Sequence, residues 1–400
     1  MEKRTLRIAI VAGETSGDIL GSGLINELKK QSDVDIEFVG IGGSQMAEQG
    51  FASDAEMEKL SIMGFEGLWE NLREILSIRK TLLQNLIKRP PDVFIGIDVP
   101  DFNLTLEKKL RQQGIPTIHY VSPTVWAWRS YRIFKIRKAV SLMLTLFPFE
   151  KSYYEERGVP VTFVGHPLAK KLSPDDFVQS KDLGLQQIVK DAREKGNRLV
   201  AALPGSRRSE VDALGQLFID SIVEIYQQFE NVTFIVPLAN QRVSQQFKAL
   251  VEQSVHKDLL KESVYFVDGN ESTNVMRESD VVLLASGTAA LESSLLAKPT
   301  IVAYKVSSLT YWFARLTSRV KYVAMPNHLL EKPIVPEFLQ GDATVDNLSS
   351  AVLRYLSDQA LYQDTCQQLA TIHPLLNRDS DKLAAQSVLK FIDKRVEKND

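Results

Sequence analysis

Short apolar runs alternate with helical patterns along almost the whole chain. Eleven runs predict strands: residues 6–12, 36–41, 93–97, 117–121, 142–147 and 161–164 in the first half, and residues 198–203, 233–237, 264–267, 281–285 and 300–304 in the second. Between them, apolar residues recur every three or four positions, as at 104–113, 211–229, 244–253 and 286–296. Because strands alternate with helices, the pattern predicts parallel sheets of the α/β class.

The two series of strands are separated by a polar, charged stretch. At 400 residues, the chain is also longer than one typical domain. We therefore expect one doubly wound, Rossmann-like domain over residues 1–167, a linker over 168–197 and a second such domain over 198–372. Residues 373–400 form a helical tail in this interpretation. Ligands of such sheets bind at the carboxyl ends of the strands, so two facing domains would place them in a cleft.

Composition excludes several classes of protein. Apolar residues make up 44% of the chain and charged residues 24%, which is typical of a globular protein. The net charge of −2 argues against bulk nucleic-acid binding, so we expect no nucleic-acid partner. No segment approaches the roughly 20 apolar residues that span a bilayer, and the run at 6–12 is too short for a signal peptide. The single cysteine, Cys366, fits a reducing compartment.

Small residues join a buried strand to a helix between Ala285 and Glu292. Backbone N–H groups at the start of a helix favour an anion. Ser286 and Thr288 add hydroxyl donors on either side of Gly287, and the Glu292 carboxylate can accept hydrogen bonds from a ribose. The segment therefore predicts a nucleotide site, with an ordinary capped turn as the alternative.

A second candidate for phosphate binding follows the strand at 198–203. Gly205 permits close approach of the backbone, Ser206 follows it, and the Arg207 guanidinium can pair with a diphosphate. We expect Arg208 to be solvated. The alternative is a pair of surface arginines after a turn.

The first strand leads into A-G-E-T-S-G-D at residues 12–18. The glycine spacing of the dinucleotide fingerprint is not completed, which disfavours an NAD enzyme. Because Glu14 and Asp18 would repel a pyrophosphate, this loop, with Ser16 and Gly17, suits a hydroxyl-rich sugar better than a phosphate. A capped turn is the alternative.

Asp98 directly follows the buried run at 93–97. A carboxylate there is costly unless it is paired or used. At a strand end that faces a cleft, it is placed to act as a general base. We expect Asp101 to cap the helix that follows.

No motif predicts a metal site. The five histidines are scattered, and the chain has neither an H-E-x-x-H motif nor a cysteine pair. The acidic pair Asp33 and Asp35 lies before a strand, so we expect an exposed loop there. Walker A and G-x-S-x-G motifs are also absent.

Apolar residues recur at helical spacing from residue 67 to 89, with basic residues beside them. The pattern is typical either of a core helix or of an amphipathic helix in a membrane interface. Under the second interpretation, the residues in contact with lipid would be Met63, Phe65, Leu68, Trp69, Leu72, Ile75 and Leu76. Two further segments, 126–138 and 311–321, also combine aromatic and basic residues.

Nine motifs, in order, closely resemble those of the lipid-A-disaccharide synthases, bacterial glycosyltransferases of the GT-B type (glycosyltransferase family 19). They are A-G-E-T-S-G-D (12–18), G-I-G-G (40–43), M-G-F-E (63–66), G-I-D-V-P-D-F-N (96–103), Y-V-S-P-T-V-W-A-W (120–128), V-G-H-P-L (164–168), L-P-G-S-R (203–207), A-S-G-T-A-A-L-E (285–292) and M-P-N-H-L-L (325–330). The resemblance covers nearly the whole chain.

The resemblance implies an inverting glycosyltransferase of lipid A biosynthesis that needs no cofactor. The donor would be UDP-2,3-diacylglucosamine and the acceptor 2,3-diacylglucosamine 1-phosphate (lipid X). The products would be the β-1,6-linked disaccharide 1-phosphate and UDP. The enzyme would be cytoplasmic and peripheral, bound to the lipid surface of the inner membrane through its first domain. Its C-terminal helices would pack back or be exchanged within a homodimer.

The resemblance also suggests roles for single residues. Asp98 would take the proton from the acceptor's 6-hydroxyl, and the acceptor side would be lined by Glu14, Ser16, Gly17 and Asp18. The UDP-sugar would be held by Gly205, Ser206, Arg207, Ser286, Gly287, Thr288, Glu292 and Asn327. Two rival interpretations stay open: a UDP-N-acetylglucosamine 2-epimerase, which would need no membrane helix, and a non-catalytic sugar-binding protein.

Overall fold

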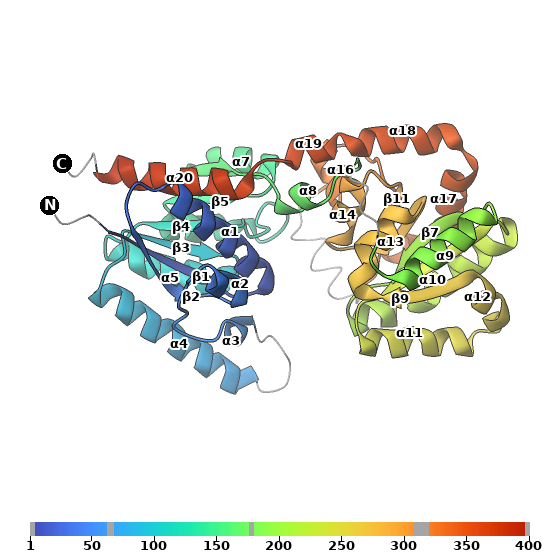
Figure 1. The fold of residues 1–400 in the computed structure, drawn as a ribbon, viewed down its shortest axis with the longest axis horizontal. Coiled ribbons are helices and arrows are strands. Elements are labelled where there is room, and N and C mark those ends of the chain that lie inside the picture. Colours follow the sequence, from blue (N-terminus) through green and yellow to red (C-terminus); the bar gives the residue numbers. More distant parts are fainter. Residues whose placement is uncertain (1–4, 62–67, 176–179, 307–319, 397–400) are drawn as a thin grey trace. The chain divides into compact units, whose positions relative to one another are not determined.

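The chain forms two compact units, residues 1–170 with 376–400 and residues 171–375 (Figure 1). The computed structural model describes residues 5–61, 68–175, 180–306 and 320–396, without the side chains of residues 61, 68–72 and 396. Each unit is built on a six-stranded sheet in which all neighbouring strands are parallel. The predicted α/β class, with two doubly wound domains, is confirmed.

The sheet of the first unit has the order β2-β1-β3-β4-β5-β6. Its strands are β1 (Leu6–Ala12), β2 (Ile36–Ile41), β3 (Val93–Ile97), β4 (Thr117–Tyr120), β5 (Leu142–Thr145) and β6 (Val161–Phe163). Its helices are α1 (Thr15–Gln31), α2 (Ser44–Glu48), α3 (Glu58–Ser61), α4 (Leu68–Lys88), α5 (Pro100–Gln112), η1 (Ser130–Arg132), α6 (Ile133–Ala139), α7 (Pro148–Glu155) and α20 (Ser380–Val396), and α8 (Pro167–Lys171) ends this part of the chain.

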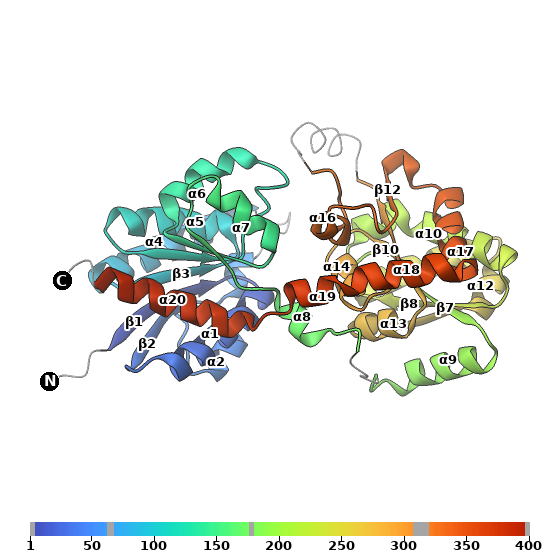
Figure 2. The same ribbon diagram turned by 90° about the horizontal axis from the view of Figure 1, so that it is seen from above.

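The last helix of the chain completes the core of the first unit. Figures 1 and 2 show α20 alongside α1, and the two helices are in extensive contact. Leu24 and Leu28 of α1 and Ala385 and Val388 of α20 belong to one buried cluster with the strands. Each large side chain buried in this way contributes about 1.5–3 kcal/mol. The expectation that the C-terminal helices pack back is therefore met by α20.

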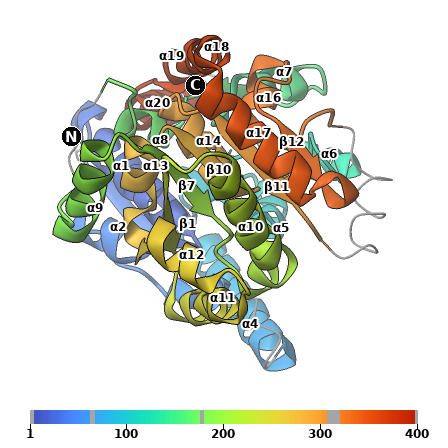
Figure 3. The ribbon, with the colours of Figure 1, turned by 90° about the vertical axis from the view of Figure 1, so that its right-hand side faces the viewer.

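The sheet of the second unit has the order β12-β11-β10-β7-β8-β9. Its strands are β7 (Arg198–Leu203), β8 (Val232–Leu238), β9 (Val264–Asp268), β10 (Val281–Ala285), β11 (Thr300–Tyr304) and β12 (Glu337–Leu339). Its helices are α9 (Leu183–Glu194), α10 (Arg208–Gln228), α11 (Gln241–Gln253), α12 (Lys257–Ser263), η2 (Gly269–Glu271), α13 (Ser272–Glu278), α14 (Ala289–Leu295), α16 (Met325–Leu330), η3 (Gln340–Asp342), α17 (Val345–Ser357), α18 (Gln359–Ala370) and α19 (Ile372–Leu376). Figure 3 shows α10 and α17 side by side, and their apolar faces share one core.

All eleven predicted strands are present, and the differences lie at element ends. β12 was not predicted because its three residues are only half-buried and form no apolar run. Asp358 separates α17 from α18: its carboxylate accepts a hydrogen bond from the Leu361 N–H at 2.9 Å and so begins α18. The capping role of Asp101 was wrong: α5 begins at Pro100, a favoured first position, and Asp101 pairs with Arg132 instead.

Candidate functional site

In both sheets the strand order reverses between two neighbouring strands, and such a reversal opens a crevice at their carboxyl ends. The reversal lies between β1 and β3 in the first unit and between β7 and β10 in the second. All but one of the catalytic, acceptor and donor residues predicted from the sequence follow one of these four strands. They are Glu14, Ser16, Gly17 and Asp18 after β1, Asp98 after β3, Gly205, Ser206 and Arg207 after β7, and Ser286, Gly287, Thr288 and Glu292 after β10.

Asp98 lies in a tight turn at the end of β3. Its φ of 53° and the φ of 41° at Val99 place two consecutive non-glycine residues in the left-handed region. Such conformations cost about 1–3 kcal/mol each and persist only where the surroundings hold them. The Asp98 N–H donates to the Tyr120 carbonyl at 2.9 Å, and the Val99 N–H donates to Asp98 Oδ1 at 2.9 Å. The turn thus presents a half-buried carboxylate at the strand end.

The loop after β1 touches this turn. A Cβ at Gly13 would lie 2.6 Å from Cγ2 of Val99, so glycine is what lets the two loops approach. Burial raises the pKa of Glu14, and the neighbouring Asp98 charge raises it further. The reversal in the first unit therefore holds two carboxyl groups. Glu14 keeps its proton to higher pH than a free glutamate and can then donate as well as accept.

The other three residues of this loop have different surroundings. Ser16 is exposed on the first turn of α1. Gly17 is buried, and a Cβ there would lie 3.5 Å from Cγ2 of Ile97. The buried Asp18 carboxylate accepts hydrogen bonds from the backbone N–H groups of Gly43, Gln45 and Met46 at 2.8, 2.8 and 3.1 Å. Gly17 and Asp18 therefore shape the loop, whereas Glu14 and Ser16 are on its outer surface.

A cavity of about 390 Å³ lies at the reversal in the second unit. Its walls come from the loops after β7, β8, β9 and β10 and include seven of the eight residues predicted to bind the donor: Gly205, Ser206, Arg207, Ser286, Gly287, Thr288 and Glu292. A Cβ at Gly287 would meet nothing within 4 Å, so its backbone borders open space. Gly205 has a φ of 127°, where a side chain would be strained and would collide with Glu210.

Glu210 is a cavity residue that the sequence analysis missed. Its Oε2 accepts hydrogen bonds from the backbone N–H groups of Ser206 and Arg207 at 2.7 and 3.2 Å. Its Oε1 lies 3.9 Å from Nη1 of Arg207. The carboxylate thus occupies donors at the start of α10 that would otherwise face an anion. A glutamate three positions into a helix is the sequence signal that could have identified it.

Glu292 lines the cavity from the first turn of α14. The Thr273 hydroxyl donates a hydrogen bond to its Oε2 at 3.1 Å. Burial raises the pKa of Glu292, and this hydrogen bond partly offsets the shift. Ser286 is held at the end of β10 because its N–H donates to the Ala303 carbonyl of β11 at 2.9 Å.

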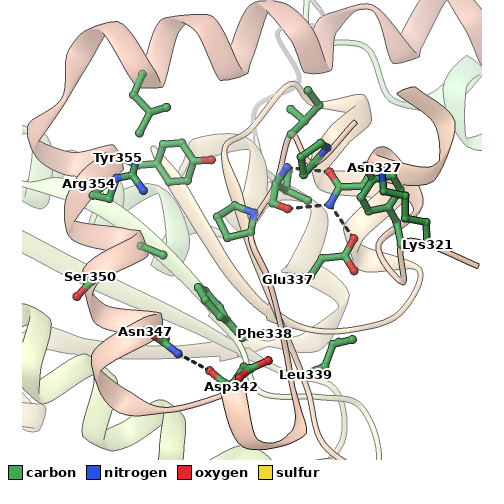
Figure 4. A pocket seen from close by; sticks show the side chains of 17 residues that line it. Lys321, Asn327, Glu337, Phe338, Leu339, Asp342, Asn347, Ser350, Arg354 and Tyr355 are labelled. Atoms are coloured by element: carbon green, nitrogen blue, oxygen red, sulfur yellow. Dashed lines mark hydrogen bonds between the residues drawn. The ribbon is translucent and has the colours of Figure 1, made fainter. Parts of the chain in front are cut away.

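Asn327 is the predicted donor residue that does not line this cavity. It borders another cavity, of about 640 Å³, beside β12, α16 and α17 (Figure 4). Its Nδ2 donates to the Val335 carbonyl at 2.8 Å and to Glu337 Oε1 at 2.7 Å, and its Oδ1 accepts from the Val335 N–H at 2.8 Å. The fully buried amide fastens the segment before β12 to α16.

The residues predicted to contact lipid are only partly described. Met63 and Phe65 lie outside the described residues, and Leu68, Trp69 and Leu72 belong to α4 but their side chains are not described. Ile75 is half-buried and packs against the core of the first unit, as a core helix would place it, whereas Leu76 is 45% exposed. The aromatic part of the segment 311–321 also lies outside the described residues.

The segment 126–138 contributes an exposed aromatic surface. Among the described residues, the large aromatic side chains that are clearly exposed are those of Trp128, Tyr131 and Phe134, at 43%, 68% and 64%. They recur every three residues, with Trp128 just before η1, Tyr131 in η1 and Phe134 in α6. The Arg129 guanidinium lies over the Trp128 ring, 4.2 Å from its centroid.

The described residues offer neither a metal-binding cluster nor a helix that could cross a membrane. No group of three or more histidine, cysteine, aspartate or glutamate side chains is arranged to hold a metal ion within that part of the chain. None of the described helices combines the length and the apolar character needed to cross a membrane.

Known proteins resemble this chain both in sequence and in fold. A family model described as lipid-A-disaccharide synthetase matches residues 8–388. The lipid-A-disaccharide synthase of Hahella chejuensis is 42% identical over 396 residues, which cover 98% of this chain and 96% of that protein. The synthase of Pseudomonas syringae pv. syringae is 45% identical over 390 residues, 97% of each chain.

Solved structures share the fold at low sequence identity. A putative UDP-N-acetylglucosamine 2-epimerase from Listeria monocytogenes has a TM-score of 0.63 at 16% identity and covers 99% of this chain and 98% of its own. The glycotransferase of kitacinnamycin has a TM-score of 0.61 at 14% identity, with coverage of 97% and 99%. These two likenesses show the GT-B fold alone.

Proposed function

The chain belongs to the lipid-A-disaccharide synthase family, and we propose that its two strand-order reversals hold the two substrates of that reaction. The protein is a glycosyltransferase of lipid A biosynthesis. It joins UDP-2,3-diacylglucosamine to lipid X and releases UDP. Because the relatives at this identity and coverage are lipid-A-disaccharide synthases, the epimerase and the non-catalytic sugar-binding protein are excluded as alternatives.

The donor site in this proposal is the 390 Å³ cavity of the second unit. The observation that carries the proposal is that seven residues from two distant sequence motifs line this one cavity. The Arg207 guanidinium and the hydroxyl groups of Ser286 and Thr288 are suited to the diphosphate, whose charge grows as UDP leaves. Gly205 and Gly287 let the backbone approach it, Ser206 offers its hydroxyl group, and the Glu292 carboxyl takes the ribose hydroxyls.

Asp98 is the general base of the proposed mechanism. The 6-hydroxyl oxygen of lipid X attacks C1 of the donor sugar from the side opposite the diphosphate. The bond between C1 and the diphosphate oxygen breaks, UDP carries away the electron pair, and the hydroxyl proton passes to the Asp98 carboxylate. Glu14 and Ser16 contact the acceptor sugar, whereas Gly17 and Asp18 keep their loop in place. Asn327 supports the second unit from outside the donor cavity.

We further propose that the first unit binds the lipid surface of the inner membrane from the cytoplasmic side. Both substrates carry acyl chains, so the site must reach molecules that lie in a bilayer. Leu76, together with Met63, Phe65, Leu68, Trp69 and Leu72 of the predicted stripe, would contact acyl chains. Trp128, Tyr131 and Phe134 support this, because aromatic side chains flanked by five basic residues and no acid in 126–138 suit an anionic lipid surface.

We further propose a homodimer with exchanged C-terminal parts, as the family resemblance suggests; the contact of α20 with α1 is compatible with it. An exchanged pair would repeat this contact between two chains, with α20 of one copy on α1 of the other. The apolar residues that make the contact would be the same in both cases.

A direct assay tests the proposed reaction and its base together. Purified protein is given both substrates in detergent, and the disaccharide 1-phosphate and UDP are measured for the wild type, Asp98→Ala and Asp101→Ala. We expect both products from the wild type and from Asp101→Ala, since the Asp101 side chain is exposed and pairs with Arg132. Asp98→Ala should lose about 100-fold or more of kcat. A folded wild type that makes no disaccharide, or an Asp98→Ala enzyme with full activity, would refute the proposal.

A further inference from the structure

We propose that Asn103 is the positioning residue that holds Asp98 in its reactive orientation. The proposal rests on the role of Asp98 as the base. Asn103 lies on the first turn of α5, and its side chain is fully buried. It therefore touches neither substrate, and its effect on the reaction passes through the turn at Asp98.

The amide of Asn103 reaches both strands of the reversal. Its Nδ2 lies 2.8 Å from the Asp98 carbonyl oxygen, 3.3 Å from that of Ile97 and 3.4 Å from that of Val11. Val11 belongs to β1 and Ile97 to β3. One side chain thus joins the two strand ends, and its shortest hydrogen bond is to the residue that carries the base.

The turn needs such a restraint because its backbone is strained. A left-handed conformation is unusual for a non-glycine residue and is most costly for a β-branched one such as Val99. Asp98 and Val99 adopt it in succession, at φ 53° and 41°. Without the hydrogen bond to the Asp98 carbonyl, this peptide loses its side-chain restraint and can relax toward extended conformations. The Asp98 carboxylate would then turn away from the strand end.

The sequence provides room for the restraint at Gly96. A Cβ there would lie 2.9 Å from Cβ and Cγ of Asn103 and 2.3 Å from Oε1 of Glu107. Only glycine therefore leaves space for these two polar side chains of α5. One turn beyond Asn103, the same Oε1 lies 2.6 Å from Nδ1 of His119 on β4. This second buried contact fixes α5 against the sheet. Of the two polar side chains, Asn103 and Glu107, it is Asn103 that reaches Asp98.

Steady-state kinetics of Asn103→Ala, with Thr105→Ala on the same helix as the control, tests the proposal. We expect kcat to fall about 10- to 100-fold, as small misplacements of a reacting group do. KM for both substrates should change less than about threefold, since the substrate contacts are untouched. Thr105→Ala should keep kcat. A kcat of Asn103→Ala within about twofold of the wild type would overturn the proposal.

Two double variants separate positioning from a general loss of structure. Asn103→Ala should cost no further kcat in an Asp98→Ala background, because there is no base left to position. Val99→Gly should restore part of the kcat of Asn103→Ala, since glycine adopts positive φ without strain. If Asn103→Ala does not fold, Asn103→Leu, which keeps the volume of the side chain but removes the donor, replaces it in both comparisons. Additive losses without rescue would overturn the proposal.

The experiments distinguish failure of the proposed function from failure of the positioning role of Asn103. A wild type that makes no disaccharide would refute the reaction itself. An Asp98→Ala enzyme with full kcat would refute the base and, with it, the role of Asn103. An inactive Asp98→Ala enzyme together with a fully active Asn103→Ala enzyme would refute the positioning role alone.

Discussion

The Asp18 carboxylate accepts a hydrogen bond from the backbone N–H of Gly43 at 2.8 Å, and this bond joins the first turn of α1 to the loop after β2. Two more N–H groups at the start of α2 donate to the same carboxylate. Asp18 therefore stabilises the loop after β2 and the start of α2, although the sequence motif that contains it predicts contact with a sugar.

Asp18→Ala should destabilise the first unit by at least about 3 kcal/mol, because a buried donor left without a partner costs about 1–3 kcal/mol and three are affected together. Urea unfolding measures the change. Ser16→Ala, two residues away on the exposed side, should leave the free energy of unfolding unchanged and weaken binding of lipid X instead. Normal stability with lost acceptor affinity in Asp18→Ala would show direct contact with the ligand.

Arg207 and Arg208 form a matched pair for testing the donor cavity. Their side chains are 81% and 82% exposed, but only Arg207 lines the cavity. Arg207→Ala should weaken UDP binding about 10- to 100-fold, because a hydrogen bond to a charged group contributes about 1.5–3 kcal/mol. Arg208→Ala should change it little. Calorimetric titration with UDP measures both, and equal losses in the two variants would contradict the assignment.

The strand ends could be predicted from the sequence because a buried run that stops at small or polar residues marks a strand end in an α/β fold. The loops after β1, β3, β7 and β10 were all found in this way. The direction of single side chains could not be predicted. Asp18 and Asn327 were assigned to ligands, yet each is buried among backbone groups of another segment. Such partners lie far away in sequence, so no local pattern reveals them.

The restraint on Asp98 was missed for the same reason. Asn103 stands in a helical pattern whose apolar positions predict α5, and nothing in the spacing shows that its amide faces Asp98. The apolar stripe on α4 shows a second limit of prediction from sequence, which concerns how far an apolar face is covered. Ile75 and Leu76 are neighbours in that stripe, but Ile75 packs on the core and Leu76 is exposed. Periodicity locates an apolar face, whereas the neighbouring elements decide how much of it is covered.

The exposed aromatic surface of the segment 126–138 makes the membrane proposal testable. Replacing Trp128, Tyr131 and Phe134 together by serine should weaken binding to phosphatidylethanolamine vesicles containing phosphatidylglycerol by about tenfold or more, since buried aromatic area is lost. Co-sedimentation measures the bound fraction. Leu183→Ser and Val255→Ser provide the control, because these side chains are 77% and 91% exposed in the second unit. Unchanged binding of the triple variant would exclude this surface from lipid contact.

The buried carboxyl of Glu150 should make the stability of the first unit depend on pH. Burial raises its pKa from 4.5 to about 7, although hydrogen bonds from the Phe147 N–H and the Trp126 indole N–H favour the ionised form. Between these two values the folded protein holds a proton that the unfolded chain has released. The contribution of Glu150 to the free energy of unfolding therefore falls as pH rises from 4.5 to about 7 and stays level above it.

The whole effect amounts to at most about 3 kcal/mol. Glu150→Gln removes this titration, so the difference in unfolding free energy between wild type and variant isolates it from other groups. Denaturant unfolding followed by tryptophan fluorescence from pH 4.5 to 8 measures that difference, with Glu155→Gln as an exposed control on the same helix. We expect the wild type to lose stability relative to Glu150→Gln as pH rises through this window. Parallel profiles for the two proteins would mean that Glu150 is already ionised when buried, held by its hydrogen-bond donors.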